Sequence, residues 1–315
     1  MKDKERIIIA GGNGFLGSAL AKKLVDENFD VVVLTRSPEN SDPDIRQVFW
    51  DGKTLGDWQW YLEGAHGLIN FTGKSVHCVP NKTNCEELLH SRVDSVKVLA
   101  QAARLCVNPP AVWVQASSLG AYGNCDDTPI DESAPYGEGF SAGLCRFWEG
   151  ALEQAELPRT RKVVLRIGLV LGPNGGALQS LAGVTRWFLG GVAGNGKQYL
   201  SWLHIDDFTE MVLWCLRREK ISGTLNATGP FPVTNAEFMQ KLRKALGRPW
   251  CPPAPAFVVS LFVRWVLQSN PELALHGRRC RPTKFRQLGF RFRYTSLDYT
   301  LQKILKPDDV CLGPA

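Results

Sequence analysis

The chain has 315 residues, which is enough for about two domains of ordinary size. Hydrophobic residues make up 44% and charged residues 22%, values that exclude collagen, a coiled coil and an intrinsically disordered chain. Lys and Arg number 37 and Asp and Glu 31, so the net charge is +6. This modest excess of positive charge raises the question of an anionic partner, which the placement of the basic residues has to answer.

The cysteines and the apolar segments bear on metal binding and location. Nine cysteines are scattered along the chain without the Cys-x-x-Cys spacing of a zinc site, so we expect no bound metal and reduced thiols. The apolar run over 7–10 is too short for a signal peptide. The longest apolar stretch, 255–267, contains Arg264 and falls short of the ~20 residues of a membrane span. The sequence therefore predicts a cytoplasmic protein with no membrane partner.

Short β-branched segments alternate with helical patterns over the first two-thirds of the chain. The expected strands cover residues 6–10, 31–35, 47–50, 67–72, 111–116 and 162–167. The expected helices cover residues 15 onward, about 85–105 and 140–154. This alternation predicts βαβ units and a doubly wound parallel sheet, a Rossmann-like α/β fold.

The regular alternation ends near residue 172, and segments rich in Pro and Gly interrupt the later part of the chain. They lie at 122–139, 172–177, 229–233 and 248–256. Loops of this length in an α/β domain are often functional. We expect a first domain over 1–235, with parts of a substrate lobe inserted after about residue 172, and a small mixed C-terminal domain over 236–315.

The segment after the first strand is rich in glycine and opens a helix. Gly12, Gly14 and Gly17 satisfy the pattern GxGxxG, and Gly11 with the last two satisfies GxxGxxG. Glycines here allow a tight turn against a pyrophosphate, and the first N–H groups of the helix point at the phosphates. Because a strand precedes the motif and a helix follows it, the motif predicts a dinucleotide site. The expected contacts are Gly11, Asn13, Gly14, Phe15, Leu16 and Gly17.

The end of the second strand distinguishes the two nicotinamide dinucleotides. A site for NAD normally has Asp or Glu here to hold the ribose 2′-hydroxyl. This chain has Thr35, Arg36 and Ser37 instead. Because a guanidinium pairs well with a phosphate, we expect Thr35 and Arg36 to contact NADP, with NAD the less favoured cofactor. The alternative is that Arg36 is a solvated loop residue.

Further motifs, taken with the glycine loop, resemble the extended short-chain dehydrogenase/reductase superfamily of nucleotide-sugar epimerases and dehydratases. They lie at 117–123, 166–172, 202–207, 226–230 and 233–238. With 248–250 and 288–292, the chain is similar to an atypical epimerase-like subfamily, labelled a SulA-type cell-division inhibitor, that ends in a domain of unknown function. The resemblance implies that further residues lie along the cofactor: Phe71, Thr72, Gly73, Glu87, Arg92, Ser117 and Leu169. For Glu87 and Arg92, a solvated ion pair is the alternative.

The usual acid–base residues of this superfamily are missing. Its members use a Tyr and a Lys four residues later on a helix, with a Ser that positions the substrate. Aligned on Glu149, the chain has Ser141 at the Tyr position and Cys145 at the Lys position, and neither can do that work. Ser118 matches the superfamily's Ser. The resemblance therefore predicts an intact cofactor site beside an altered proton-transfer site.

Other side chains are weighed as substitutes for the dyad. Tyr122 offers a phenol just after the fifth strand, and with Ser118 it is our catalytic candidate; packing in a Tyr-Gly turn is the alternative reading. Cys145 also fits a small buried hydrophobic residue. His204 lies in a turn that chiefly buttresses the fold in the superfamily, and a lone His more often has a structural partner than a catalytic role.

The basic residues concentrate near the C-terminus. Seven of them and no acidic residue lie over 278–293, and without these seven charges the net charge falls from +6 to −1. A solvated face, a site for an anionic substrate or protein partner, and a nucleic-acid site are the three readings. No nucleic-acid motif accompanies the segment, so we do not expect a nucleic-acid partner. Aromatic residues alternate there as on a buried strand face: Phe285, Phe290, Phe292 and Tyr294.

Two functions follow from these patterns. The first is an NADP-dependent oxidoreductase or epimerase-like enzyme acting on an unidentified small molecule, for which the basic segment suggests negative charge. The second is a catalytically silent NADP-binding regulator associated with cell division, which the missing dyad and the resemblance suggest. The sequence gives no indication of the oligomeric state.

Overall fold

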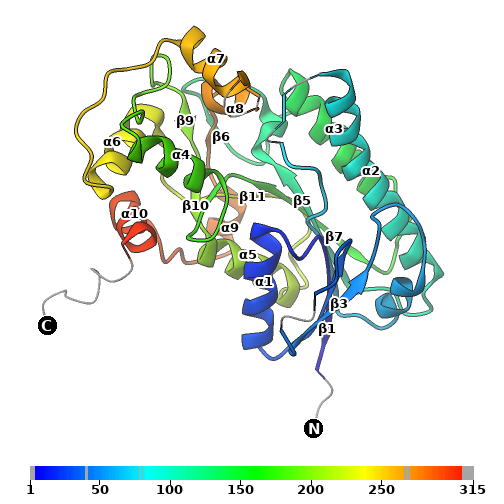
Figure 1. The fold of residues 1–315 in the computed structure, drawn as a ribbon. Helices are drawn as coiled ribbons and strands as arrows, with labels where there is room; N and C mark the ends of the chain where they lie inside the picture. Colours follow the sequence, from blue (N-terminus) through cyan, green and yellow to red (C-terminus); the bar gives the residue numbers. More distant parts are fainter. Residues whose placement is uncertain are drawn as a thin grey trace, which may run out of the picture.

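A computed structural model describes residues 4–39, 42–76, 78–79, 81–265, 268 and 270–306. At its centre lies a sheet of seven parallel strands in the order β11-β7-β5-β4-β1-β2-β3 (Figure 1). The strands are β1 (Arg6–Ala10), β2 (Asp30–Thr35), β3 (Ile45–Phe49), β4 (Gly67–Asn70), β5 (Val112–Ser118), β7 (Arg161–Ile167) and β11 (Gly223–Ala227). The strand order reverses between β1 and β4, and open α/β sheets bind ligands at this point, outside the carboxyl ends of the strands.

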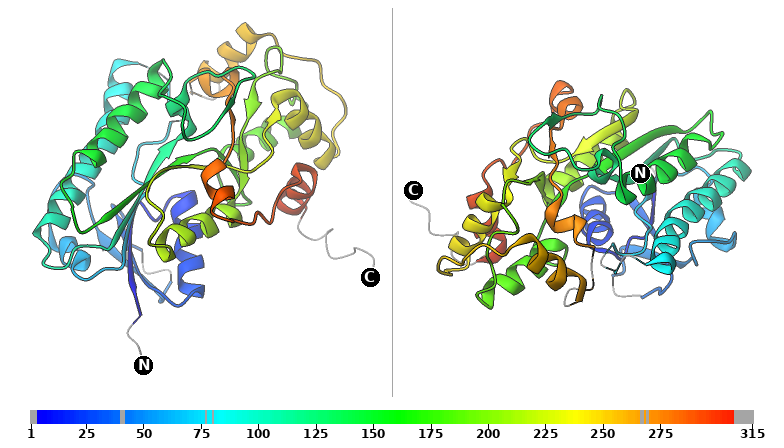
Figure 2. Two further views of the ribbon diagram at one scale, coloured as in Figure 1. Left: turned by 180° about the vertical axis from the view of Figure 1, so that it is seen from behind. Right: turned by 90° about the horizontal axis from the view of Figure 1, so that it is seen from above.

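Two pairs of helices cover the sheet, one pair on each face (Figure 2). Helices α1 (Phe15–Asp26) and α5 (Ile205–Arg217) lie on one face, and α2 (Lys82–Leu105) and α3 (Phe140–Glu153) lie on the other. The predicted doubly wound Rossmann-like fold is confirmed, and the six expected strands are present with small shifts in their bounds.

The apolar strands explain why both faces are covered. Successive side chains of a strand point to opposite faces, so a strand buried on both sides must be apolar throughout. In β1, Ile7 and Ile9 pack into the core beneath α1 and α5, while Ile8 packs into the core beneath α2 and α3. Leu20 and Leu24, one helical turn apart on α1, complete the first core.

The seventh strand was not predicted from the sequence. Strand β11 begins at Gly223, which has a φ of +73°, and it contains Asn226, so its local β propensity is weak. Parallel pairing with β7 along its full length fixes it instead. Such pairing between segments far apart in the chain leaves no local pattern to read.

Apart from the 3-10 helix η1 (Asp57–Leu62), which packs beside α2, the remaining elements form a smaller mixed lobe, seen at the left of Figure 1, and connections to it. The helices are α4 (Ala177–Arg186), α6 (Asn235–Ala245), α7 (Ala256–Trp265), α8 (Glu272–Leu275), α9 (Thr283–Gln287), α10 (Leu297–Leu305) and the 3-10 helix η2 (Leu119–Tyr122). Three strand pairs join β8 (Leu169–Leu171) to β10 (Trp202–His204), β9 (Tyr199–Leu200) to β12 (Val233–Thr234), and β6 (Pro129–Ile130) to β13 (Arg279–Cys280). The domain boundary at residue 235 stays a prediction. Within the described ranges, no helix is long and apolar enough to cross a membrane.

The aromatic alternation near the C-terminus does not form a strand, so that expectation is wrong. Phe285 lies in helix α9, which ends before Gly289, a residue with a φ of +84°. Phe290 and Tyr294 are buried in a segment without regular structure, and Phe290 packs edge-on against Trp214 of α5 at 5.1 Å. The aromatic side chains serve as contacts of a connecting segment with α5, which a period of two cannot distinguish from a strand.

Candidate functional site

The glycine-rich segment forms the turn between β1 and α1. Gly11 has a φ of +78°, a left-handed conformation that favours glycine, and its N–H donates to the carbonyl of Leu34 at 3.0 Å. A Cβ on Gly11 would lie 3.0 Å from backbone atoms of Phe71 and Thr72. The loop therefore lies directly against the chain that leaves β4, at the switch point of the sheet.

Helix α1 begins at this loop with an open end. Gly14 is its N-cap residue, no side chain caps the helix, and its first turn has no acidic residue. The first N–H groups of a helix have no acceptor within the helix, so an uncapped end suits an anion. The ring of Phe15 packs against Gly172, Gly175 and Gly176, on each of which a Cβ would lie 2.9 Å from the ring. The second glycine-rich loop is thereby held beside the first.

Asn13 connects the glycine loop to the end of β2 and to the middle of β3. Its side-chain amide donates to the hydroxyl of Thr35 at 3.0 Å and to the amide oxygen of Gln47 at 3.4 Å. Arg36 follows Thr35 and is exposed, and within the described ranges its guanidinium forms no hydrogen bond or ion pair. The predicted residues Asn13, Thr35 and Arg36 thus lie together. Sequence reasoning missed Gln47, because a residue 34 positions from Asn13 gives no local signal.

Arg92 is a buried cation behind the chain that leaves β4. It is 8% exposed, and its guanidinium donates to the carbonyls of Leu88 at 3.0 Å and Lys74 at 3.1 Å. It lies 5.0 Å above the ring of Trp148, and burial lowers its pKa. A Cβ on Gly73 would lie 3.1 Å from the guanidinium carbon. Arg92 therefore positions this loop, and the direct cofactor contact expected for it stays a prediction.

The remaining atoms of this edge fit a dinucleotide. The Thr72 hydroxyl is buried, and no group in the described part of the chain engages its oxygen. Such an orphaned polar atom is costly unless a ligand satisfies it. Leu16 packs partly buried against the core of α1, and a Cβ on Gly17 would lie 2.6 Å from Gly12. Glu87 differs from these residues, because its carboxylate is 55% exposed and forms an ion pair with Lys74.

A buried ionic network lies beyond the end of β5. Glu149 and Arg166 are 6% and 5% exposed and form a two-pronged ion pair with distances of 2.9 and 3.0 Å. The hydroxyls of Ser117 and Tyr136 donate to the two oxygens of the same carboxylate. Burial and this carboxylate raise the pKa of Tyr136 to about 12. Ser117, expected beside the cofactor, thus has its hydroxyl directed into the network.

Tyr122 lies in the same buried region. It is 3% exposed, its hydroxyl donates to Asn226 at 2.8 Å, and Arg166 lies 4.7 Å from its ring. Burial raises the pKa of Tyr122 to about 12. An acid–base group works best with a pKa near the operating pH, so these contacts favour packing over proton transfer for Tyr122.

Two serines and a carboxylate lie near one another beyond the end of β5. The Ser118 hydroxyl accepts a hydrogen bond from the N–H of Gly120 at 3.0 Å, and Ser118 and Ser141 approach the same side of Gly120. The Ser141 hydroxyl donates to the carboxylate of Glu272, on α8, at 3.4 Å. Cys145 is 3% exposed, and burial raises its pKa. Glu272 was missed, because it lies 131 residues from Ser141 on a helix of four residues.

Leu169 and His204 begin and end a strand pair beside these loops. Leu169 begins β8 and is half-buried, and its N–H donates to the carbonyl of Ser201 at 2.8 Å. His204 caps helix α5, where its Nδ1 accepts from the N–H of Asp206 at 3.0 Å. The ring of His204 stacks on Tyr294 at 3.6 Å. His204 therefore has structural partners on both sides.

Because His204 is buried, we expect the free energy of unfolding to fall in mild acid. Burial lowers the pKa of His204 from 6.5 to about 4, so between these values the unfolded chain binds more protons than the folded one. The contribution of neutral His204 to stability is present above the pKa that it has in the unfolded chain and is lost as the pH falls. The free energy of unfolding should therefore drop by about 2 kcal/mol from about pH 7 to about pH 5. His204→Asn keeps a helix cap and should remove this part of the slope in urea unfolding. An unchanged slope in the variant would assign the pH dependence to other groups.

The seven basic residues of 278–293 do not all have free charged groups. Lys284 donates to the carbonyl of Thr224 at 2.8 Å, and Arg279 donates to the carbonyl of Asp127 at 3.3 Å. Of the other five, Arg278 is half-buried, and four are exposed: Arg281, Arg286, Arg291 and Arg293. The anionic substrate expected from this segment stays a prediction.

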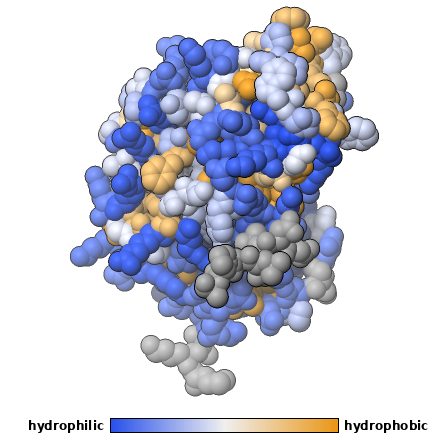
Figure 3. All heavy atoms as spheres, turned by 90° about the vertical axis from the view of Figure 1, so that its left-hand side faces the viewer, coloured by the Kyte–Doolittle hydropathy of each residue, from blue (hydrophilic) through white to orange (hydrophobic). Residues whose placement is uncertain are grey.

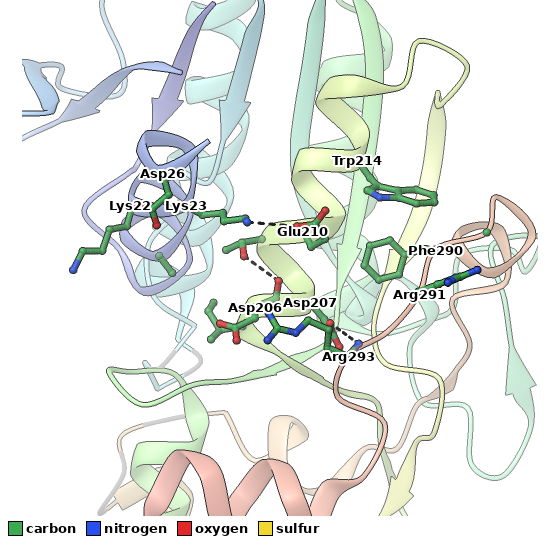
Figure 4. A pocket seen from close by; sticks show the side chains of 14 residues that line it. Lys22, Lys23, Asp26, Asp206, Asp207, Glu210, Trp214, Phe290, Arg291 and Arg293 are labelled. Carbon is green, nitrogen blue, oxygen red and sulfur yellow. Dashed lines mark hydrogen bonds and ion pairs between the residues drawn. The ribbon is translucent and has the colours of Figure 1, made fainter. Parts of the chain in front are cut away.

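Two of these arginines line a hollow of about 750 Å³ between α1, α5 and the segment 289–293 (Figure 4). The hollow lies along the later turns of α1, and Lys23 pairs across it with Glu210 at 3.7 Å. The buried carboxylate of Asp207 accepts from the backbone N–H of Arg293 at 3.0 Å. Groups of both signs line the walls, so the charges of this hollow do not select an anion. In the described residues, no cluster could hold a metal ion.

Comparisons with known proteins agree with this geometry. A family model described as the NAD dependent epimerase/dehydratase family matches residues 7–227, and a domain of unknown function, DUF1731, matches residues 254–304. A chloroplastic homolog of epimerase family protein SDR39U1 from Arabidopsis thaliana is 30% identical over 308 residues, covering 95% of this chain and 86% of the relative. The human protein SDR39U1 is 31% identical over 308 residues, covering 95% and 99% of the two chains.

Solved structures show the same similarity. The crystal structure of human SDR39U1 with NADPH matches with a TM-score of 0.83 at 30% identity, covering 95% of this chain and 98% of that one. The UDP-N-acetylglucosamine 4-epimerase from Bacillus cereus matches with a TM-score of 0.76 at 18% identity, covering 99% of both chains, which shows a shared fold. A structure of WbmG from Bordetella bronchiseptica contains NAD.

Proposed function

Because the chain belongs to the NAD dependent epimerase/dehydratase family, we propose that it binds NADP(H) and acts on a small molecule as a reductase or epimerase-like enzyme. The observation that carries the proposal is the open N-terminus of α1 beside the orphaned hydroxyl of Thr72, both facing the switch point of the sheet. The NADPH named in the human SDR39U1 structure supports the choice of cofactor.

The residues of this chain suit distinct parts of such a cofactor. The α1 end and Gly11–Gly17 would hold the pyrophosphate, and Thr35 with Arg36 would hold a 2′-phosphate. Arg92 connects α2 to the loop that leaves β4, because its guanidinium donates to the carbonyl of Leu88 in α2 and to that of Lys74 in the loop. When bound, the nicotinamide would supply or accept a hydride. Ser118, Ser141 and Glu272 would position the substrate, and the Glu272 carboxylate would take or give the proton.

Reversing the charge of Arg36 tests the choice of NADP over NAD. We expect Arg36→Glu to weaken NADPH binding by about 10–100-fold, because a charged contact to the 2′-phosphate is replaced by repulsion. Binding of NADH, which lacks this phosphate, should change little. Isothermal titration calorimetry with both cofactors measures the ratio. Lys97→Glu, an exposed charge reversal on α2, is the matched control. A wild-type protein that binds neither cofactor would refute the proposed function itself.

A catalytically silent NADP-binding regulator is the second candidate. The observations that favour it are the burial of Cys145 and the raised pKa of Tyr122, which make these two side chains poor acid–base groups near neutral pH. The relatives described above have epimerase-family names, so an association with cell division rests only on the resemblance of the sequence motifs. Oxidation of NADPH, followed by its absorbance with a panel of ketones and nucleotide sugars, separates the candidates. Turnover that Arg36→Glu abolishes would exclude the silent regulator.

A further inference from the structure

Helix α7 presents an apolar face to solvent. Val259 and Val263 are its buried side chains, whereas Phe257, Leu261 and Trp265 are 75%, 62% and 72% exposed. These three residues are spaced by four positions, so they form one stripe along the helix. Apolar residues gather at the top of the face shown in Figure 3, the height at which α7 lies in Figure 1. An exposed stripe of this kind marks an interaction surface.

A second group of aromatic side chains lies on the segments that lead to α7. The chain that follows α4 runs beside the chain that precedes α7, joined by the pairing of Ala193 with Ala254. Trp187, Phe188 and Trp250 on these segments are 81%, 57% and 74% exposed. Exposed aromatic side chains therefore lie both on α7 and on the two segments that run side by side before it.

In the two stretches that carry these aromatic residues, every charged side chain is basic. No acidic residue occurs over 157–205 or over 238–271, the two stretches that carry them. Arg186 and Arg264 are exposed, and Arg248 is half-buried beside the second group. This combination of aromatic and basic side chains complements a surface that is both apolar and anionic.

We propose that this face docks on the surface of a bilayer containing anionic lipids. Trp and Phe side chains favour the depth of the lipid headgroups, and arginine pairs with lipid phosphates. Helix α7 is about 15 Å long, so it lies in the plane of the membrane surface. The sequence-based prediction of no membrane partner rested only on the lack of an apolar stretch long enough to span a membrane. Hydropathy alone could not show which side chains of this apolar stretch are exposed.

Vesicle binding of the full-length protein tests the proposal. The probes are vesicles of phosphatidylcholine alone and of phosphatidylcholine with phosphatidylglycerol at about three parts to one, sedimented with the protein. We expect binding to the anionic vesicles that weakens with salt. Replacing Phe257, Leu261 and Trp265 by Ser should reduce it by about tenfold or more, and Arg264→Glu should reduce it less. Trp60→Ser with Phe147→Ser, which are 71% and 65% exposed elsewhere, is the matched control and should bind as the wild type does.

The outcomes separate the possible occupants of the face. Absence of wild-type binding to anionic vesicles, or equal binding by the triple variant, overturns the proposal. Self-association that depends on α7 and occurs without lipid binding overturns it in favour of a second copy of the chain. NADPH binding and the midpoint of thermal unfolding, measured on each variant, show whether the fold is intact. If the triple variant does not fold, Leu261→Glu alone replaces it, with the same expected loss.

Discussion

Replacing Glu149 by Ala is expected to lower the free energy of unfolding by about 3–5 kcal/mol. Glu149 and Arg166 are both almost fully buried, and the carboxylate accepts two hydrogen bonds from the guanidinium. Without the carboxylate, the charge of Arg166 remains buried between the rings of Tyr122 and Tyr136. Removal of one partner of such a pair costs far more than loss of a surface ion pair. Urea unfolding of the variant and the wild type measures the difference.

Two further variants show whether the charge or the shape of Glu149 matters. Glu149→Gln preserves the size of the side chain but removes its charge. We therefore expect its free energy of unfolding to lie between those of the wild type and Glu149→Ala. Tyr136→Phe removes one hydrogen bond at the edge of the network and should cost about 1 kcal/mol. Equal stability of Glu149→Ala and the wild type would show that this ion pair does not hold the end of β5.

The parts of the fold that could be predicted are those with a strong local pattern. Strand β1 and helix α1 each have a clear pattern over a short segment, and the glycine motif that joins them spans eight residues. Strand β11 has no such pattern, since only pairing with β7 makes it a strand. For the segment around Phe290, the sequence pattern correctly predicted buried aromatic side chains but wrongly predicted a strand. The segment packs against α5, which is distant in the sequence.

The candidate site divides in the same way. Asn13, Thr35 and Arg36 could be predicted because each lies next to a strand or helix boundary. Gln47 and Glu272 could not, since they reach the site only through the folded arrangement of distant elements. For Arg92 the helix was predicted correctly, but only the structure shows that the guanidinium folds back onto the chain. The direction of a side chain depends on tertiary packing, and a periodic pattern in the sequence does not reveal that packing.

Replacing Gly17 by Val is expected to weaken NADPH binding by about 100-fold. A Cβ on Gly17 would lie 2.6 Å from the Cα of Gly12 and 2.8 Å from the carbonyl oxygen of Gly11. Both are backbone atoms, so relief of the contact requires α1 and the glycine loop to separate. The N–H groups at the start of α1 would then no longer face the pyrophosphate.

A glycine of a different helix gives the control for this effect. Gly150 lies within α3, and a Cβ there would have no atom within 4 Å. Gly150→Ala should therefore leave NADPH binding unchanged and should stabilise the protein by up to about 1 kcal/mol, because Ala favours a helix over Gly. Titration calorimetry and urea unfolding of both variants distinguish a local steric effect from a general loss of stability. If Gly17→Val binds NADPH as tightly as the wild type does, close packing of α1 on the loop is not what forms the site.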